Sequence, residues 1–137
     1  MYDQLAQPFY KDPETGRLYS TEPGYEVFDL VMTASQVQTD LSQTFPKDSA
    51  FLWLGLAGSS TGAYKLQMQK PDGRLLSSAA VRNTNLIGTA QFPVPIFPAV
   101  FVPAGGVVKI NSITELTGAG NTIQIVFVGV RLYATRQ

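Results

Sequence analysis

The sequence predicts an all-β protein, an antiparallel β-sandwich or jelly roll with an extended N-terminal arm. Three observations predict this class. From residue 26 onward, apolar and polar residues alternate with a period of two in short segments. Clusters of Gly, Asn, Asp and Ser separate these segments, as is typical of antiparallel sandwiches. Only in one stretch, residues 33–45, is a helix of more than two turns an alternative to a strand.

Length and composition limit what the chain can do. A chain of 137 residues is expected to form one domain with a real core. It has neither Cys nor His, which excludes disulfides and thiolate metal sites and removes the commonest general base. Ten basic and ten acidic residues give a net charge of zero, which argues against a nucleic-acid partner and favours association. Charged residues are only 15% of the chain, so we expect part of the surface to be covered in the working state.

The first 25 residues differ from the rest, and we predict an extended N-terminal arm (residues 1–25) followed by a jelly-roll body (residues 26–137). The arm holds four of the six tyrosines, and turn-forming residues are dense in it. Two interpretations stay open: a frayed terminus, or an arm whose aromatic rings dock on a neighbouring subunit. In the second case the partner-binding residues are Tyr2, Phe9, Tyr10, Tyr19 and Tyr25.

The first strands of the body follow in order. Residues 26–32 place Phe28, Leu30 and Met32 on one face of a strand. In the stretch 33–45, strand and helix remain alternatives, because its apolar residues also fit helical spacing. Residues 49–58 form a strand that is apolar on both faces, with Phe51 and Trp53 on one face and Leu52, Leu54 and Leu56 on the other.

The next strands are joined by a tight turn. Residues 63–69 alternate cleanly and point Tyr64, Leu66 and Met68 inward. The sequence Pro-Asp-Gly at residues 71–73 predicts a turn. Residues 73–82 are then expected to return as the following strand.

Residues 91–106 combine four prolines with large apolar side chains. Proline fixes φ and removes a backbone donor, which predicts a semi-rigid extended strip that does not need ladder partners. Such a strip carries its apolar residues either onto its own sandwich or onto a second subunit, and both alternatives stay open. Phe97 and Phe101 are therefore candidate interface residues.

The last two strand segments, residues 106–118 and 122–135, flank a turn at residues 118–121. The final strand is apolar on both faces and needs a second layer on each side. A loop of the same chain or a second subunit can supply that layer. One face carries Ile123, Ile125 and Phe127, whereas the other carries the candidate interface residues Val126, Val128 and Val130, with Leu132 beyond them.

Catalytic motifs are scarce. The stretch GSSTG fits a nucleophile elbow with Ser60 as nucleophile, but no helix follows and no His exists, so we interpret it as a hairpin loop. Asp29 and Glu115 form the one conceivable carboxylate pair, and we interpret both as outward residues on half-buried strands. The sequence therefore predicts no catalytic, metal or cofactor site, and a protein that is not an enzyme.

The tyrosine-bearing arm, the all-β body and the C-terminal pair FVPAGGVVKINSITEL and NTIQIVFVGVRLY together resemble a known family. They resemble the small jelly-roll virion proteins of tailed bacteriophages, above all the cement or decoration proteins. The resemblance implies a capsid-stabilising structural protein that binds and bridges the major capsid protein on the head exterior. It also implies a homo-oligomer, a dimer or trimer, that is made in the host cytoplasm.

Two alternatives remain. One is another phage structural module, such as a tail, head-neck or fibre-linked component. The other is a carbohydrate-binding β-sandwich that uses Trp53 or surface tyrosines as sugar platforms. No apolar run of about 20 residues and no signal-peptide layout occurs, so we expect no membrane partner and no export.

Overall fold

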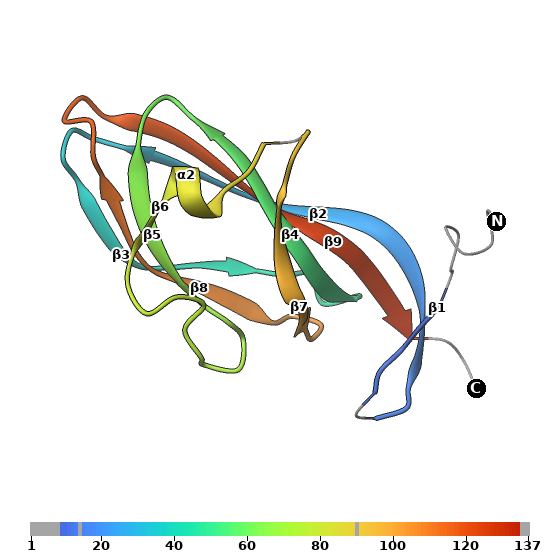
Figure 1. The fold of residues 1–137 in the computed structure, drawn as a ribbon. Helices are drawn as coiled ribbons and strands as arrows, with labels where there is room; N and C mark the ends of the chain where they lie inside the picture. Colours follow the sequence, from blue (N-terminus) through green and yellow to red (C-terminus); the bar gives the residue numbers. More distant parts are fainter. Residues whose placement is uncertain (1–8, 14, 90, 135–137) are drawn as a thin grey trace.

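The computed structural model describes residues 9–13, 15–89 and 91–134, and it confirms the all-β antiparallel sandwich. Two sheets pack face to face (Figure 1). Sheet A has the strand order β1-β2-β9-β4-β7, and sheet B has the order β3-β8-β5-β6. The strands are β1 (Phe9–Lys11), β2 (Leu18–Met32), β3 (Val37–Thr44), β4 (Ala50–Ser60), β5 (Tyr64–Gln69), β6 (Val81–Arg82), β7 (Val94–Val102), β8 (Val107–Glu115) and β9 (Asn121–Ala134), with one short helix, α2 (Asn83–Leu86).

The chain moves from one sheet to the other at most of its connections. From β2 to β9, only β5 and β6 follow each other within the same sheet. The two longest strands, β2 and β9, pair from Tyr19 with Ala134 to Met32 with Asn121. Their far ends reach beyond sheet B as a ribbon, on which β1 adds a third strand (Figure 1). Among the described residues, no helix is long and apolar enough to cross a membrane.

The core lies between the inner faces of the two sheets and is rich in aromatic side chains. Phe127 is fully buried, and its ring centroid lies 5.2 Å from that of Trp53 and 5.5 Å from that of Phe45. Strand β5 turns Tyr64, Leu66 and Met68 into the same core, as its alternation predicts. The inward face of β9 is likewise confirmed, because Ile123, Ile125 and Phe127 are all buried.

The ambiguous stretch 33–45 is a strand, so the helical alternative is wrong. Residues Val37–Thr44 form β3, which pairs with β8, and Leu41 packs against the core. Ser, Thr and Asp are weak helix formers, and the sheet partner decides between the two periods. The return strand predicted at residues 73–82 is also wrong for most of its length. Only Val81 and Arg82 form β6, and the residues before them form an irregular loop.

Strand β4 contains a bulge that the alternation did not reveal. Its pairing with β9 shifts between Trp53 and Gly55, so Leu54 is an extra residue and is exposed. A bulge moves the following residues to the opposite face of the sheet. Leu56 therefore joins Trp53 in the core, and the prediction that placed it on the other face is wrong.

The proline-rich segment forms β7, the edge strand of sheet A, and the prediction that it needs no ladder partner is wrong. It pairs with β4, for example Phe51 with Val102 and Gly55 with Pro95. Proline is compatible with an edge strand because one side of that strand needs no donors. Ile96, Val100 and Val102 pack on the core, so this part of the segment covers its own sandwich.

Candidate functional site

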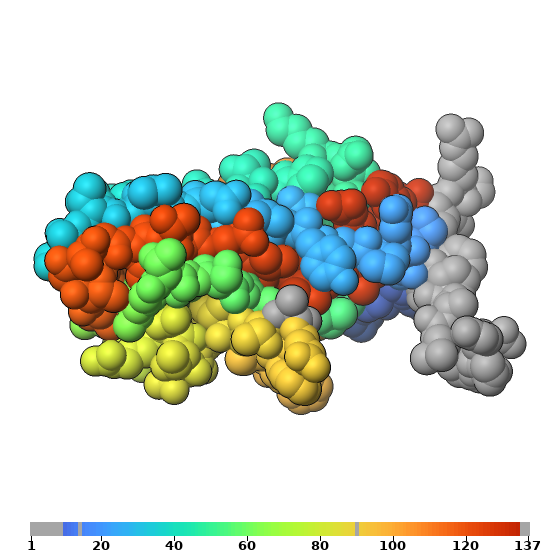
Figure 2. All heavy atoms as spheres, turned by 90° about the horizontal axis from the view of Figure 1, so that it is seen from above, coloured from blue at the N-terminus to red at the C-terminus, as the bar shows by residue number. Residues whose placement is uncertain are grey.

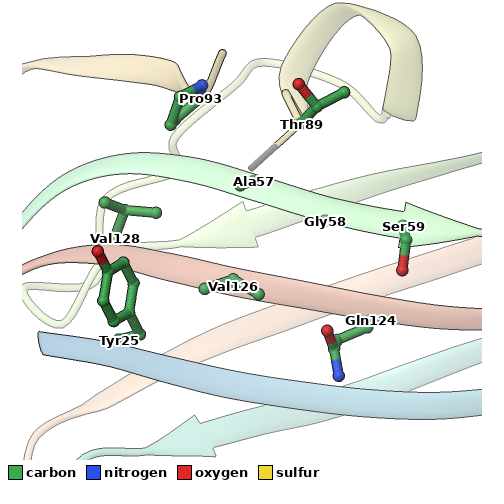
Figure 3. Close-up of a pocket in the computed structure, with 9 residues that line it drawn as sticks. All are labelled: Tyr25, Ala57, Gly58, Ser59, Thr89, Pro93, Gln124, Val126 and Val128. Atoms are coloured by element: carbon green, nitrogen blue, oxygen red, sulfur yellow. The ribbon is translucent and has the colours of Figure 1, made fainter. Parts of the chain in front are cut away.

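An apolar groove of about 600 Å³ lies on the outer face of sheet A, the face turned away from sheet B (Figure 3). Its volume is within the usual range of ligand-binding pockets. Seen from above, β2 and β9 run side by side here, and the segment around α2 flanks them (Figure 2). We call it the outer-face groove; it is lined by Tyr25, Ala57, Gly58, Ser59, Thr89, Pro93, Gln124, Val126 and Val128.

The floor of the groove follows from the register of three strands. Val126 and Val128 alternate with the buried face of β9 and therefore point outward. Val128 lies opposite Tyr25 on β2 and Gly55 on β4, and Val126 lies opposite Ala57. The small residues of β4 leave the floor low, whereas the Tyr25 ring rises beside it (Figure 3).

The opposite wall is the segment that follows α2, and a close backbone approach fixes it. The N–H of Gly88 donates to the carbonyl of Leu56 at 3.1 Å, and the N–H of Gly58 donates to the carbonyl of Gly88 at 2.9 Å. A Cβ on Gly88 would lie 2.2 Å from the carbonyl oxygen of Phe92, so only glycine fits there. This contact holds Thr89 and Pro93 beside β4.

The chemistry of the groove is that of contact rather than of reaction. None of its lining residues is charged, and its polar groups lie mainly on Ser59, Thr89 and Gln124. The amide of Gln124 is already oriented, since it donates to Asp29 Oδ1 at 3.0 Å. Val27 lies opposite Val126 and extends the apolar surface of the groove onto β2, and exposed apolar surface of this kind commonly marks a binding site. Other exposed large apolar residues of β2, β4 and the wall segment are Val31, Leu54 and Phe92.

The residues predicted for the N-terminal arm fall into different places. Tyr2 lies outside the described residues, and Phe9 belongs to β1. The rings of Tyr10 and Tyr19 lie 6.4 Å apart in a tilted arrangement, and Tyr19 is buried against its own body. Tyr25 is 59% exposed and lines the groove.

The division at residue 25 stays a prediction. The expected start of the first long strand was wrong, however, because β2 begins at Leu18 and continues through residue 25 without interruption. Pairing with β9 along this whole length explains the earlier start.

The predicted interface residues divide the outer face of β9 into two halves. Leu132 is buried by the chain itself in a small cluster with Tyr19, and the half-buried Val130 and Phe101 pack against this cluster; the rings of Tyr19 and Phe101 lie 6.2 Å apart. Val126 and Val128 instead line the open groove. Phe97, on the edge strand, is 94% exposed and belongs to neither half.

Sequence reasoning missed the residues of β4 and of the wall segment that complete the groove. Ala57 and Gly58 carry a recognisable signal, because small residues inside an apolar strand indicate a close approach of another chain segment. Thr89 and Pro93 carry no such signal, since only the fold of the loop after α2 brings them to the sheet.

The candidate catalytic residues are not brought together. Asp29 lies exposed on the outer face of sheet A, whereas Glu115 is buried at the end of β8 in sheet B, so its predicted outward position is wrong. Ser60 ends β4 and donates to the carbonyl of Gly62 at 2.8 Å. Among the residues that the structure describes, no cluster of acidic side chains can hold a metal ion.

Glu115 joins two turns at one end of the sandwich. Its carboxylate accepts hydrogen bonds from the backbone N–H groups of Ser35, Thr117 and Gly118, at 2.6 to 2.9 Å, and from the Thr117 hydroxyl. The Thr117 hydroxyl, with these N–H groups, lowers the pKa of Glu115 to about 2, although burial opposes the shift. The residue is a structural clamp.

This clamp predicts an acid-sensitive fold. The folded-state pKa of Glu115 lies below the ordinary value of 4.5, so its contribution to stability is complete above pH 4.5 and is lost as pH falls toward 2. We expect Glu115→Gln to be less stable than wild type at pH 7 and to lose less stability between pH 5 and pH 2.5. Urea unfolding of both proteins across this range measures the difference, and identical pH profiles would contradict the assignment.

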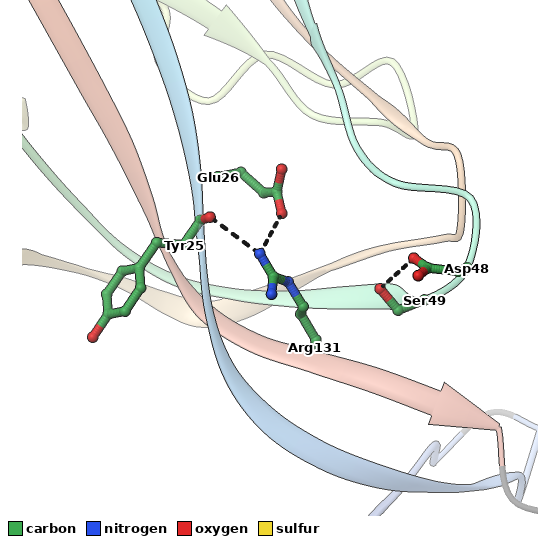
Figure 4. A network of polar contacts seen from close by, with 5 residues as sticks. All are labelled: Tyr25, Glu26, Asp48, Ser49 and Arg131. Atoms are coloured by element: carbon green, nitrogen blue, oxygen red, sulfur yellow. Dashed lines mark hydrogen bonds and ion pairs between the residues drawn. The ribbon is translucent and has the colours of Figure 1, made fainter.

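An ion pair joins β2 and β9 on the face of sheet A opposite to the groove (Figure 4). Arg131 Nη2 lies 3.3 Å from Glu26 Oε2 and donates to the carbonyl of Tyr25 at 3.5 Å. The Arg131 stem lies on Gly24, where a Cβ would be only 2.7 Å from its Cγ. Arg131 Nε is buried and has no hydrogen-bond partner among the described residues.

No protein-family model matches the chain, and no curated protein matches it either. The outer-face groove and the sequence itself therefore carry what is proposed for this chain.

Proposed function

We propose that this protein is a virion structural protein, a phage head cement or decoration protein that binds and bridges major capsid protein subunits. The observation that carries the proposal is the outer-face groove, which continues into the exposed apolar residues of β2. A cement protein needs contact area rather than reactive groups, and specific interfaces place aromatic anchors at their centre. Tyr25 fits this role, because its ring is exposed and lines the groove.

The finer fold assignment within this proposal is the jelly roll. Apart from the short strand β1 at the edge of sheet A, the orders β2-β9-β4-β7 and β3-β8-β5-β6 place four strands in each sheet, and the chain alternates between the two sheets at most of its connections. Two Greek keys in a double sheet define a jelly roll, an architecture that viral capsid proteins use. The strand order supports the resemblance that the sequence suggests.

Weak individual contacts suffice for this function. On a repeating lattice, a dimer or trimer engages several sites at once, and linked contacts multiply their affinities. A neutral, charge-poor chain is compatible with such close association. We place the protein on the exterior of the capsid, where such a lattice is accessible.

The proposal is tested by static light scattering of the purified protein, first alone and then mixed with empty heads built from the major capsid protein of the same genome. We expect the mass of a dimer or trimer, and a mass increase of the heads that saturates. Heads of an unrelated phage serve as the control. A monomer that leaves the mass of the heads unchanged would refute the proposal.

Glycan binding is a second candidate, and one observation favours it. The exposed Tyr25 ring stands over a groove whose end carries the hydrogen-bonding groups of Ser59, Thr89 and Gln124. Trp53 does not serve as a sugar platform, because it is fully buried and its Nε1 donates to the carbonyl of Gly55. A glycan array without hits for the wild-type protein would eliminate this candidate.

A further inference from the structure

We propose that two copies of this chain join through the open edge of β2 in antiparallel pairing, and so form a dimer in which the two copies of sheet A become one continuous sheet. The pairing itself depends only on the fold. Its use, which is to turn two outer-face grooves toward the same capsid surface, rests on the proposed function.

The backbone of β2 has an unpaired side. Among the described residues, no strand pairs with β2 on the side away from β9 between Glu22 and Met32, whereas β9 pairs with its other side throughout. The N–H of Thr61 donates to the carbonyl of Thr122, so the even-numbered residues of β9 bond with β4 and the odd-numbered ones bond with β2. In β2 the even-numbered residues therefore bond with β9, and the N–H and C=O groups of the odd-numbered residues point to the open edge.

The usable part of this edge runs from Tyr25 to Val31. Pro23, which precedes it, has no N–H to donate. Arg131 Nη2 reaches the edge and donates to the carbonyl of Tyr25 at 3.5 Å, which leaves that residue its N–H (Figure 4). The odd-numbered residues within this part alternate donors and acceptors along the edge, and such an edge pairs with a second copy of itself by a two-fold rotation.

One register uses the whole of this part. Centred on Phe28, the pairing places Tyr25 opposite Val31 of the second copy, and Val27 opposite Asp29. Tyr25 and Val31 are 59% and 72% exposed on the outer face, so their contact removes apolar surface from water. A pairing centred on Asp29 would instead place two carboxylates directly opposite each other, which is unfavourable.

The edge lacks the features that usually prevent such pairing. Natural edge strands are protected by proline or lysine, and β7, at the other end of sheet A, contains Pro95 and Pro98. Residues 25–31 contain neither, and the carboxylate of Asp29 already accepts a hydrogen bond from Gln124. The net charge of zero lets two copies approach without repulsion. A second copy presents the same unprotected edge and is therefore the partner that fits it.

The symmetry of this contact suits a bridging protein. The two-fold axis between two antiparallel strands stands perpendicular to their sheet, so both copies turn the same face of sheet A to the same side. Both outer-face grooves then lie on one surface of the dimer, with Tyr25 both in the groove and on the paired edge. A dimer formed face to face through sheet A would hide both grooves. The edge contact gives one dimer two binding surfaces for adjacent capsid subunits.

Proline at position 27 tests the pairing. Val27→Pro removes an N–H that points to the open edge and leaves the bonds with β9 intact, and β2 already contains Pro23 at an equivalent position. We expect sedimentation equilibrium to show a dimer for the wild-type chain. The variant is expected to weaken the dimer at least about tenfold, because the symmetry removes two hydrogen bonds at once. The matched control, Val27→Thr, keeps the N–H and is expected to dimerise like the wild type. Urea unfolding shows whether both variants are folded.

Engineered cysteines test the register, since the chain has none of its own. Tyr25→Cys with Val31→Cys in one chain sets each thiol opposite its counterpart in the second copy, at a separation that a disulfide spans. Within one chain the two positions lie about 20 Å apart along the strand, too far for a disulfide. We expect mild oxidation to give disulfide-linked dimers of the double variant, seen by non-reducing electrophoresis, and few of Val31→Cys alone.

A wild-type chain that is a monomer at every concentration, or a trimer, would overturn the edge contact. Undiminished dimerisation of Val27→Pro would do the same, as would equal cross-linking of the double variant and Val31→Cys. These results do not depend on capsid binding. If the dimer forms through the edge and heads fail to bind it, only the proposed function fails. If heads bind a chain that is monomeric or trimeric, only the edge contact fails.

Discussion

Tyr25→Thr combined with Val126→Thr is expected to weaken binding to heads by about 30-fold to 100-fold while the protein stays folded. The double change removes the exposed ring and places a hydroxyl on the floor of the outer-face groove. Loss of a central aromatic anchor typically costs at least about 2 kcal/mol of binding free energy, and 1.4 kcal/mol is tenfold in affinity. Both replacements place β-branched Thr in a strand, where such residues are favoured, so the fold is expected to tolerate them. Co-sedimentation with heads across a concentration series measures the loss.

The matched control is Val37→Thr. Val37 lies on β3 in sheet B, and its side chain is about as exposed as that of Tyr25. We expect it to bind heads within about twofold of the wild-type protein, because it lies on the other sheet. Urea unfolding shows whether each variant is folded. Normal binding by the double variant, or equal losses in the double variant and the control, would contradict a contact through the outer face of sheet A.

Phe127→Ala is expected to lower the free energy of unfolding by about 3–5 kcal/mol. The side chain is fully buried, and its ring contacts the rings of Trp53 and Phe45 from β4 and the turn before it. Truncation of a buried Phe loses its transfer free energy and leaves a cavity between the two sheets. Single domains are stable by only about 5–15 kcal/mol, so this one change removes a large fraction of the total.

The same truncation at an exposed site is the control for this prediction. Phe97→Ala changes a side chain that is 94% exposed, and we expect a difference within about 0.5 kcal/mol. Urea titrations of the three proteins give the free energies and show whether the slopes agree. A large loss for Phe97→Ala would mean that this ring already has a partner in solution.

Local alternation was sufficient to predict the strands whose pattern is uninterrupted. The faces of β5 and of β9 were both correct, because one buried face imposes a strict period of two. The pattern failed where a backbone irregularity changes the face. The bulge after Trp53 moved Leu56 into the core. Gly55, a glycine inside an apolar strand, is a local signal of such a bulge, but the alternation alone does not show it.

Tertiary pairing explains the other errors. The polar strand β3 and the proline-rich strand β7 are edge strands, and each is held by one neighbour in its sheet. Their own sequences give weak or contrary preferences, and contact with the partner strand decides. Similarly, β2 begins at Leu18 because β9 is long enough to pair with it there.

The groove was predictable in part. The apolar outer face of β9 and the exposed Tyr25 were already candidates from the sequence, since a two-faced apolar strand needs an explanation on each side. Val130 packs on the cluster of Tyr19 and Phe101 whereas Val126 lines the groove, and this difference depends on where Phe101 and Tyr19 pack, which is a property of the whole fold. The sequence therefore indicates the face but not the site on it.

Cryo-electron microscopy of heads saturated with the protein tests the central claim most directly. We predict density for the chain at repeating positions over the whole head, with the outer face of sheet A and Tyr25 turned toward the major capsid protein. Density confined to a unique vertex or to the tail would contradict the cement function and favour another structural module of the virion. Density over the whole head with sheet B against the shell, and the outer-face groove open to solvent, would contradict the proposed contact surface.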